Sequence, residues 1–216
     1  MLIVYGLTIF VSAMLLFVVQ PMFARMALPL LGGTPAVWNT ALVFYQAVLL
    51  AGYGYAHLLT KRLAPKKQVA VHLGVLALAL LALPIGVPAG WVPPRSENPL
   101  LWLLALLGTS VGLPFFAVSA TSPLLQTWFS QTSHKAAKDP YFLYVASNVG
   151  SMLALLSYPV LIEPRLTLRL QSLFWTFGFG GLLALMLACG VVLWRAAPAR
   201  AAAAHQDAAA APPLTA

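Results

Sequence analysis

Long apolar stretches, separated by short polar or proline-rich connections, fill most of the chain. Each stretch is long enough to cross a hydrocarbon core of about 30 Å, which takes roughly 20 residues of helix. We therefore predict an all-α fold, a polytopic transmembrane bundle of about six helices in one domain of residues 1–195. The helices are expected near residues 2–20, 37–59, 68–86, 100–121, 141–162 and 171–194.

Proline and glycine residues interrupt two of these stretches. Pro84 and Pro88, on either side of Gly86, are expected to break the third helix near its end. Gly112 and Pro114 predict a kink in the fourth helix, with backbone carbonyl groups that lack their usual helical partner.

Residues 20–36 are apolar but rich in proline and glycine, so they allow two interpretations. The segment is either a half-helix followed by a tight Gly-Gly-Thr-Pro turn or an ordinary external loop. In the first case Thr34 or Asn39 helps to satisfy the free N–H groups at the start of the next helix.

Basic residues are unevenly divided between the two ends of the predicted helices. Eight of the twelve follow the second, fourth and sixth helices: Lys61, Arg62, Lys66, Lys67, Lys135, Lys138, Arg195 and Arg200. Because cytoplasmic loops hold an excess of Lys and Arg, we expect both termini in the cytoplasm. The Ala- and Pro-rich tail of residues 196–216 is expected to be a mobile cytoplasmic extension.

Composition agrees with a membrane environment. The 216 residues are 61% hydrophobic and 7% charged, with a mean hydropathy of +0.89, whereas soluble domains are about 25% charged. The lipid bilayer is therefore an expected partner. The net charge of +8 arises from short clusters between apolar runs, so a nucleic-acid partner is not expected. Cys189 is the only cysteine, which excludes an intrachain disulfide and a cysteine-based metal site.

Polar side chains inside a bilayer are costly and tend to face the interior of a bundle, so each is a candidate for a site. The same side chains also join helices by hydrogen bonds worth on the order of 1 kcal/mol, and this structural role is the alternative for each. The candidate intramembrane binding residues, together with two charged residues expected near the far interface, are Gln20, Arg25, Trp38, Gln46, Tyr53, His57, Asn148 and Glu163.

Polar, aromatic and glycine residues are most closely spaced in the second predicted helix. Gln46 and Tyr53 are seven residues apart, and Trp38, Tyr45 and Gly52 repeat at the same interval, so each set lies near one face. Such a face either lines a polar pocket or makes a close helix contact, which glycine allows.

Three other candidate residues are interpreted individually. His57 is either an interfacial residue or a proton carrier. Asn148 is expected to form a hydrogen bond across the bundle. Glu163 precedes Pro164 and Arg165, so it either ends its helix in an exposed ion-paired turn or binds a cation.

No familiar catalytic or cofactor-binding motif occurs in the chain. The glycine-rich nucleotide motifs, the H-E-x-x-H zinc motif, the G-x-S-x-G nucleophile motif and Cys/His metal spacings are all absent. Paired-carboxylate catalysis is also hard to assemble, because the only acidic residues are the widely separated Glu97, Asp139, Glu163 and Asp207. We predict no catalytic residue, no metal site and no cofactor.

Several segments, in order along roughly residues 1–190, resemble the membrane-embedded N-terminal half of the bacterial fused major-facilitator/spermidine synthase-like family. They are Gln20–Arg25, Leu28–Trp38, Gln46, Gly52–His57, Ser122–Phe129, Asp139–Tyr144, Ser147–Ser151 and Tyr158–Pro164. In that family the helical half precedes a soluble aminopropyltransferase-like domain. The resemblance implies a membrane module in the bacterial inner membrane without the synthase domain, and it transfers no catalytic residue to this chain.

The basic loop of residues 61–67 matches the loop between the second and third helices of major-facilitator halves, but the acidic residue usual beside it is missing. That superfamily has twelve helices in two halves. A six-helix chain therefore needs to dimerise to enclose a central pathway.

Two functions follow as hypotheses. The first is a non-enzymatic membrane protein that acts as an assembly or accessory subunit of a larger membrane complex. The alternative is a small homodimeric transporter or binding module for a polyamine-like or other organic solute, which aromatic side chains hold by cation–π contact. An enzymatic role requires a separate soluble subunit that docks on the basic loops.

Overall fold

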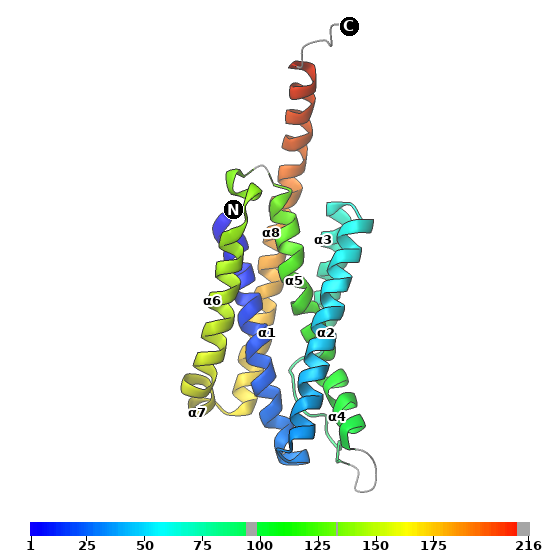
Figure 1. The fold of residues 1–216 in the computed structure, drawn as a ribbon, viewed down its shortest axis with the longest axis vertical. Coiled ribbons are helices and arrows are strands. Elements are labelled where there is room, and N and C mark those ends of the chain that lie inside the picture. The colour runs from blue at the N-terminus through cyan, green and yellow to red at the C-terminus, as the bar shows by residue number, and fades with distance from the viewer. Residues whose placement is uncertain (94–98, 133, 211–216) are drawn as a thin grey trace.

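The structure is a computed structural model that describes residues 1–93, 99–132 and 134–210, except for the side chains of residues 135, 138 and 196–210. All regular secondary structure in these residues is helical (Figure 1). In chain order the elements are α1 (Leu2–Leu31), α2 (Pro35–Arg62), α3 (Pro65–Ala79), η1 (Leu80–Ala82), α4 (Pro99–Leu107), η2 (Gly108–Gly112), α5 (Leu113–Ser130), η3 (Lys135–Lys138), α6 (Tyr141–Ser157), η4 (Tyr158–Ile162), α7 (Glu163–Arg165) and α8 (Leu168–Ala210).

Six helical spans in the described residues are long and apolar enough to cross a membrane. They are Leu2–Leu31, Pro35–Arg62, Pro65–Ala82, Pro99–Ser130, Tyr141–Arg165 and Leu168–Arg195. The prediction of an all-α bundle of six spanning helices is confirmed, and the chain is a multi-pass membrane protein. The mobility expected for residues 196–216 stays a prediction: α8 continues to Ala210, and residues 211–216 lie outside the described chain.

Met1 and the connection between α2 and α3 lie at one end of the bundle, which we call the terminal end (Figure 1). The other end, which we call the far end, holds α7 and the connection between α1 and α2. The six spans therefore return the chain to the end where it starts.

The first helix is longer than predicted, because it continues through Pro21 and Pro29 to Leu31. Proline is tolerated in a membrane helix where neighbouring groups satisfy the freed carbonyls. Gly32 then takes a positive φ of 76° and its N–H donates to the carbonyl of Leu28. The hydroxyl of Thr34 accepts from the N–H of Val37 at the start of α2. Of the two interpretations of residues 20–36, the external loop is wrong. The tight turn is present, but it follows one continuous helix from Leu2 to Leu31 and not a separate half-helix.

Two predicted interruptions are present at nearby positions. The third span ends at Ala82, two residues before Pro84. In the fourth span the irregularity is the π-helical segment η2, which ends at Gly112, and the span then continues to Ser130, beyond the predicted end. A π-helical segment shifts the hydrogen-bond register of a helix locally, which is how this span accommodates Pro114.

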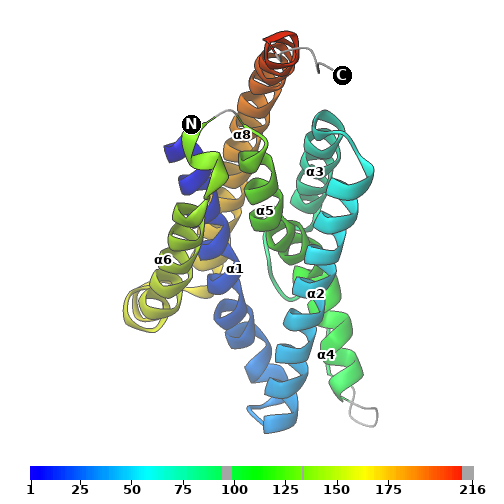
Figure 2. The ribbon, with the colours of Figure 1, turned by 45° about the horizontal axis from the view of Figure 1, so that its top comes forward.

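The helices pack in a pattern that repeats itself. α1 packs against α6, α8 and α5, whereas α5 packs against α2, α3 and α1, and α3 packs against α8. Exchanging spans one, two and three for spans four, five and six converts the α1–α6 contact into the α2–α5 contact and the α1–α8 contact into the α3–α5 contact. The α1–α5 and α3–α8 contacts are each converted into themselves. Spans three places apart also run in opposite directions (Figures 1 and 2). This is the arrangement of an inverted repeat of three helices.

Glycine residues stand at the two equivalent crossings of this repeat. A Cβ atom on Gly150 of α6 would lie 2.6 Å from the carbonyl oxygen of Phe10 in α1. A Cβ atom on Gly52 of α2 would lie 3.1 Å from Cβ of Ser119 in α5. Both pairs of helices therefore approach so closely that only glycine fits, which is how packing holds helices together in lipid.

Gly150→Ala is expected to destabilise the protein because α1 and α6 must move apart to admit the methyl group. The expected cost is about 1–3 kcal/mol, which is typical of overpacking. The matched control is Gly54→Ala, since nothing lies within 4 Å of a Cβ atom there, and its higher helix propensity adds up to about 1 kcal/mol. Thermal unfolding in detergent measures both variants. Equal melting temperatures for the two variants would show that the crossing at Gly150 is not a tight one.

Candidate functional site

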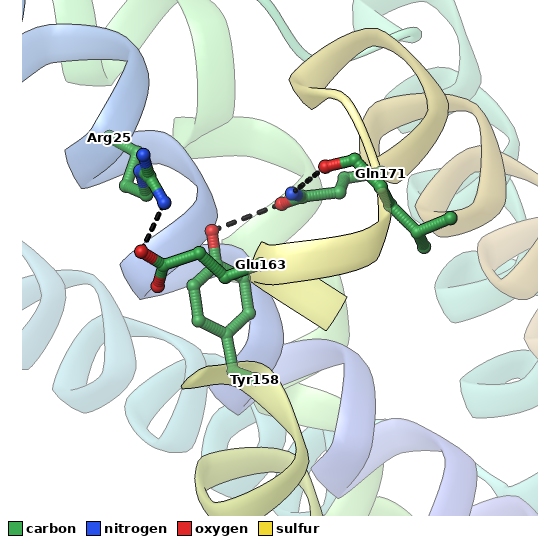
Figure 3. Close-up of polar contacts among 5 residues, drawn as sticks. Arg25, Tyr158, Glu163 and Gln171 are labelled. Carbon is green, nitrogen blue, oxygen red and sulfur yellow. Dashed lines mark hydrogen bonds and ion pairs between the residues drawn. The ribbon is translucent and has the colours of Figure 1, made fainter. Parts of the chain in front are cut away.

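A polar cluster at the far end of the bundle draws its side chains from α1, η4, α7 and α8. Arg25 of α1 forms an ion pair with Glu163 of α7 (Figure 3). The two side chains are 46% and 36% exposed, so solvent and headgroups screen the pair and its contribution to stability is small. The ion pair expected for Glu163 is present, with Arg25 as the partner, but Glu163 is half-buried and lies in the last helical turn of the fifth span and not in an exposed turn.

A hydrogen-bonded chain lies beside this ion pair. The hydroxyl of Tyr158 donates to Oε1 of Gln171 over 3.0 Å, and Nε2 of Gln171 donates to the carbonyl of Leu166 over 2.8 Å (Figure 3). Gln171 is buried in the first turns of α8. These bonds fix the turn between the fifth and sixth spans, so this cluster is a clamp on the far end. In the described residues no three potential metal ligands come together.

A second set of candidates forms a stripe on α2. Asn39, Gln46, Tyr53 and His57 are spaced at seven, seven and four residues, which places them along one side of the helix. All four are exposed, and none of their side chains forms a hydrogen bond or ion pair with the part of the chain that the structure describes. We call these four residues the polar stripe of α2. It points away from the bundle, not into a pocket within it.

The other face of α2 is the packing face. Gly52 is buried against α5, and the ring of Tyr45 lies 4.9 Å from that of Phe115, centroid to centroid. For Gly52 the close helix contact is thus the correct alternative. Trp38 and Tyr45 also line a cavity of about 20 Å³ between α1, α2 and α4, which has room for about one water molecule. The buried hydroxyl of Tyr45 has no hydrogen-bond partner in the described chain.

Gln20 and Asn148 do not reach across the bundle. Nε2 of Gln20 donates to the carbonyl of Leu16 in its own helix. Asn148 lies on the exposed side of α6, and its side chain forms no hydrogen bond with the described residues, so the expected bond across the bundle is not made. Its neighbour Gly150, two residues away, occupies the contact with α1 instead.

A buried polar network that was not predicted from the sequence lies in the terminal half of the bundle. Trp128 of α5 donates its indole N–H to Oε1 of Gln68 in α3 over 2.9 Å. Nε2 of Gln68 donates in turn to the carbonyl of Leu63 over 2.7 Å. His72, one turn further along α3, lies 3.3 Å through Nε2 from the hydroxyl of Thr121. All of these side chains except that of Leu63 are buried, and they join α3 to α5.

A signal for this network was present in the sequence. Gln68 and His72 are four residues apart in an apolar stretch, which places them on one helix face. Lys66 and Lys67 directly precede Gln68 and make it look like part of the basic loop. The network leaves Nδ1 of His72 and the hydroxyl of Tyr55 without partners in the described chain, and the two rings lie 5.9 Å apart.

Comparison of the chain with protein-family models, with curated proteins and with solved structures finds no match in any of the three.

The bond between Trp128 and Gln68 is expected to couple α3 to α5 measurably. Trp128→Phe leaves Oε1 of Gln68 buried without its donor, at a cost of about 1–3 kcal/mol. In a double-mutant cycle with Gln68→Leu, unfolding in detergent should show a coupling free energy of about 1 kcal/mol. Trp194→Phe is the control because Trp194 is 42% exposed. Additive effects of the two substitutions would contradict a role for this hydrogen bond.

Proposed function

We propose that the chain is a non-enzymatic membrane protein that acts as an assembly or accessory subunit of a larger membrane complex. The observation that carries this proposal is the polar stripe of α2. Gln46 and Tyr53 lie near the middle of a spanning helix, exposed and without a hydrogen-bond partner in the described chain.

Lipid is an unfavourable neighbour for this stripe. An amide moved into hydrocarbon without hydrogen bonds costs roughly 4–8 kcal/mol relative to water. A facing helix that supplies a partner removes most of this cost, and in membranes such interhelical bonds contribute about 1 kcal/mol each. The stripe is therefore better suited to a protein surface than to lipid, and Asn148 on α6 is in the same situation.

The proposal places the terminal end in the cytoplasm of a bacterial inner membrane. Lys61 and Arg62 end α2 there, and Lys66 and Lys67 begin α3, which agrees with an excess of basic residues in cytoplasmic loops. The resemblance to the membrane half of the fused spermidine synthase-like family supports the same orientation. A membrane half of that kind has a neighbouring domain or subunit to support, which fits an accessory role.

A homodimeric transporter or binding module for a polyamine-like or other organic solute is the second candidate. The inverted repeat favours it, because many transporters are built from such repeats and bind substrate between two units. Trp38 and Tyr45 at their small cavity supply aromatic faces for a cation. Glu163, a carboxylate that a polyamine would need, is already paired with Arg25, so we place this candidate second.

Photo-crosslinking from the stripe tests the proposal directly. A benzophenone amino acid at position 46 is expected to capture one membrane protein in native membranes, because a partner covers that side of α2. The control position is Phe177, which is 73% exposed on α8 and is expected to capture lipid only. A distinct protein adduct at position 46 supports the accessory role, and an adduct with a second copy of this chain moves the weight to the transporter. Capture of lipid alone at both positions would overturn the proposal.

A further inference from the structure

A cavity near the far end of the bundle lies between the start of α8 and the segment that follows η1. It has a volume of about 490 Å³ and is lined by Met26, residues 84–87, Leu168, Arg169, Ser172 and Leu173. Pockets for small organic molecules have volumes of about 300–1,000 Å³ and walls that are mainly apolar with a few polar groups. This cavity has the size and the mixed walls of such a pocket.

One wall of the cavity is a backbone segment that is not helical. The hydroxyl of Ser172 donates to the carbonyl of Ile85, which holds this segment against α8. The backbone N–H groups of Ile85, Gly86 and Val87 donate no hydrogen bond within the described chain, although Ile85 is only 2% exposed. Irregular backbone beside a spanning helix is tolerated where it is buried in protein or lines a water-filled cavity. The wall therefore offers hydrogen-bond donors that the chain itself does not use.

Arg169 gives the cavity an uncompensated positive charge. Its side chain forms no hydrogen bond or ion pair with the described chain, and it is the only charged residue among those that line the cavity. Glu163, the carboxylate of the neighbouring turn, is paired with Arg25. The charge and the unused donors both favour an anion as the occupant.

The equivalent place in the inverted repeat contains no such space. Gln68 in α3 and Gln171 in α8 hold equivalent positions, because each donates Nε2 to the carbonyl of a leucine five residues earlier. Val69 is therefore the counterpart of Ser172. A Cβ atom on Gly190 of α8 would lie 2.5 Å from Cγ1 of Val69, so the two helices are in close contact there. The repeat by itself thus does not require a cavity at Ser172.

We propose that this cavity binds a small organic carboxylate, with the carboxylate against Arg169 and the apolar body against Met26 and Leu173. A guanidinium group matches one carboxylate through two parallel N–H donors. One arginine neutralises one such charge, whereas a phosphate monoester would retain part of its second charge. An inorganic anion would leave the apolar walls uncovered. Binding at this site does not depend on what covers the polar stripe of α2.

The test measures the binding of radiolabelled hexanoate to the full-length chain in phosphatidylcholine nanodiscs, with empty nanodiscs as the blank. We expect saturable binding that unlabelled hexanoate displaces and that hexylamine, which has the same chain and the opposite charge, does not. Binding no greater than that of the blank, or equal displacement by the two compounds, would overturn the proposal. A small fraction of phosphatidylglycerol in the nanodisc is expected to leave the binding unchanged. Loss of hexanoate binding under that condition would assign the site to a lipid headgroup and reject the soluble acid.

Three variants make the test specific to the cavity. Arg169→Gln is expected to weaken hexanoate binding by about tenfold or more, because hydrogen bonds to a charged group are lost. Lys66→Gln is the matched control, since Lys66 precedes Gln68 by two residues as Arg169 precedes Gln171, and it is expected to leave the affinity unchanged. Gly86→Phe is expected to abolish binding, because nothing lies within 4 Å of a Cβ atom there and the ring fills the cavity.

Equal affinities of the Arg169 and Lys66 variants, or unchanged binding in the Gly86 variant, would refute the site. Monodisperse elution and helical circular dichroism confirm that each variant is folded.

Discussion

The absence of water in the hydrocarbon core is the constraint on which the rest of the structure depends. Every backbone N–H and C=O at that depth needs a partner within the protein, so the spans are helical and their irregular segments are short. The same constraint applies to side chains. Thr8 and Thr121 bond back to carbonyls of their own helices, whereas Gln68 and Gln171 bridge different elements. Polar side chains without a partner in the described residues, such as those of the α2 stripe, are the basis of the proposal that another protein covers this side of the bundle.

In lipid there is no hydrophobic driving force for helix association, so close packing holds this bundle together. Gly52 and Gly150 stand at the two crossings that the inverted repeat makes equivalent, and each admits a neighbouring backbone or short side chain. The polar network around Gln68 joins α3 to α5, and the clamp around Gln171 ties the turn before α8. Small residues thus allow the two close crossings, and hydrogen bonds between elements add to the packing along the bundle.

Length and hydropathy were enough to predict six helices, because a spanning helix needs a long apolar run whatever its neighbours are. Helix ends were less predictable: α1 continues past Pro21 and Pro29, because a membrane helix tolerates proline in its interior. The pairing of Gln68 with Trp128 joins positions 60 residues apart, and no local pattern shows it. For α2 the sequence identified the important helix and the spacing of its two faces. Only the packing shows that the glycine face is buried and the glutamine face is not.

In the cell, protein and not lipid is expected to cover the polar stripe of α2. Spin-label accessibility measures this directly, with single cysteines at positions 46 and 177 in a Cys189→Ala background, since Cys189 is the only native cysteine. In native membranes the label at position 46 should be shielded from lipid-dissolved oxygen while the label at position 177 is accessible. In nanodiscs with the isolated chain both should be accessible. A label at position 46 that is as accessible as that at position 177 in native membranes would contradict the account.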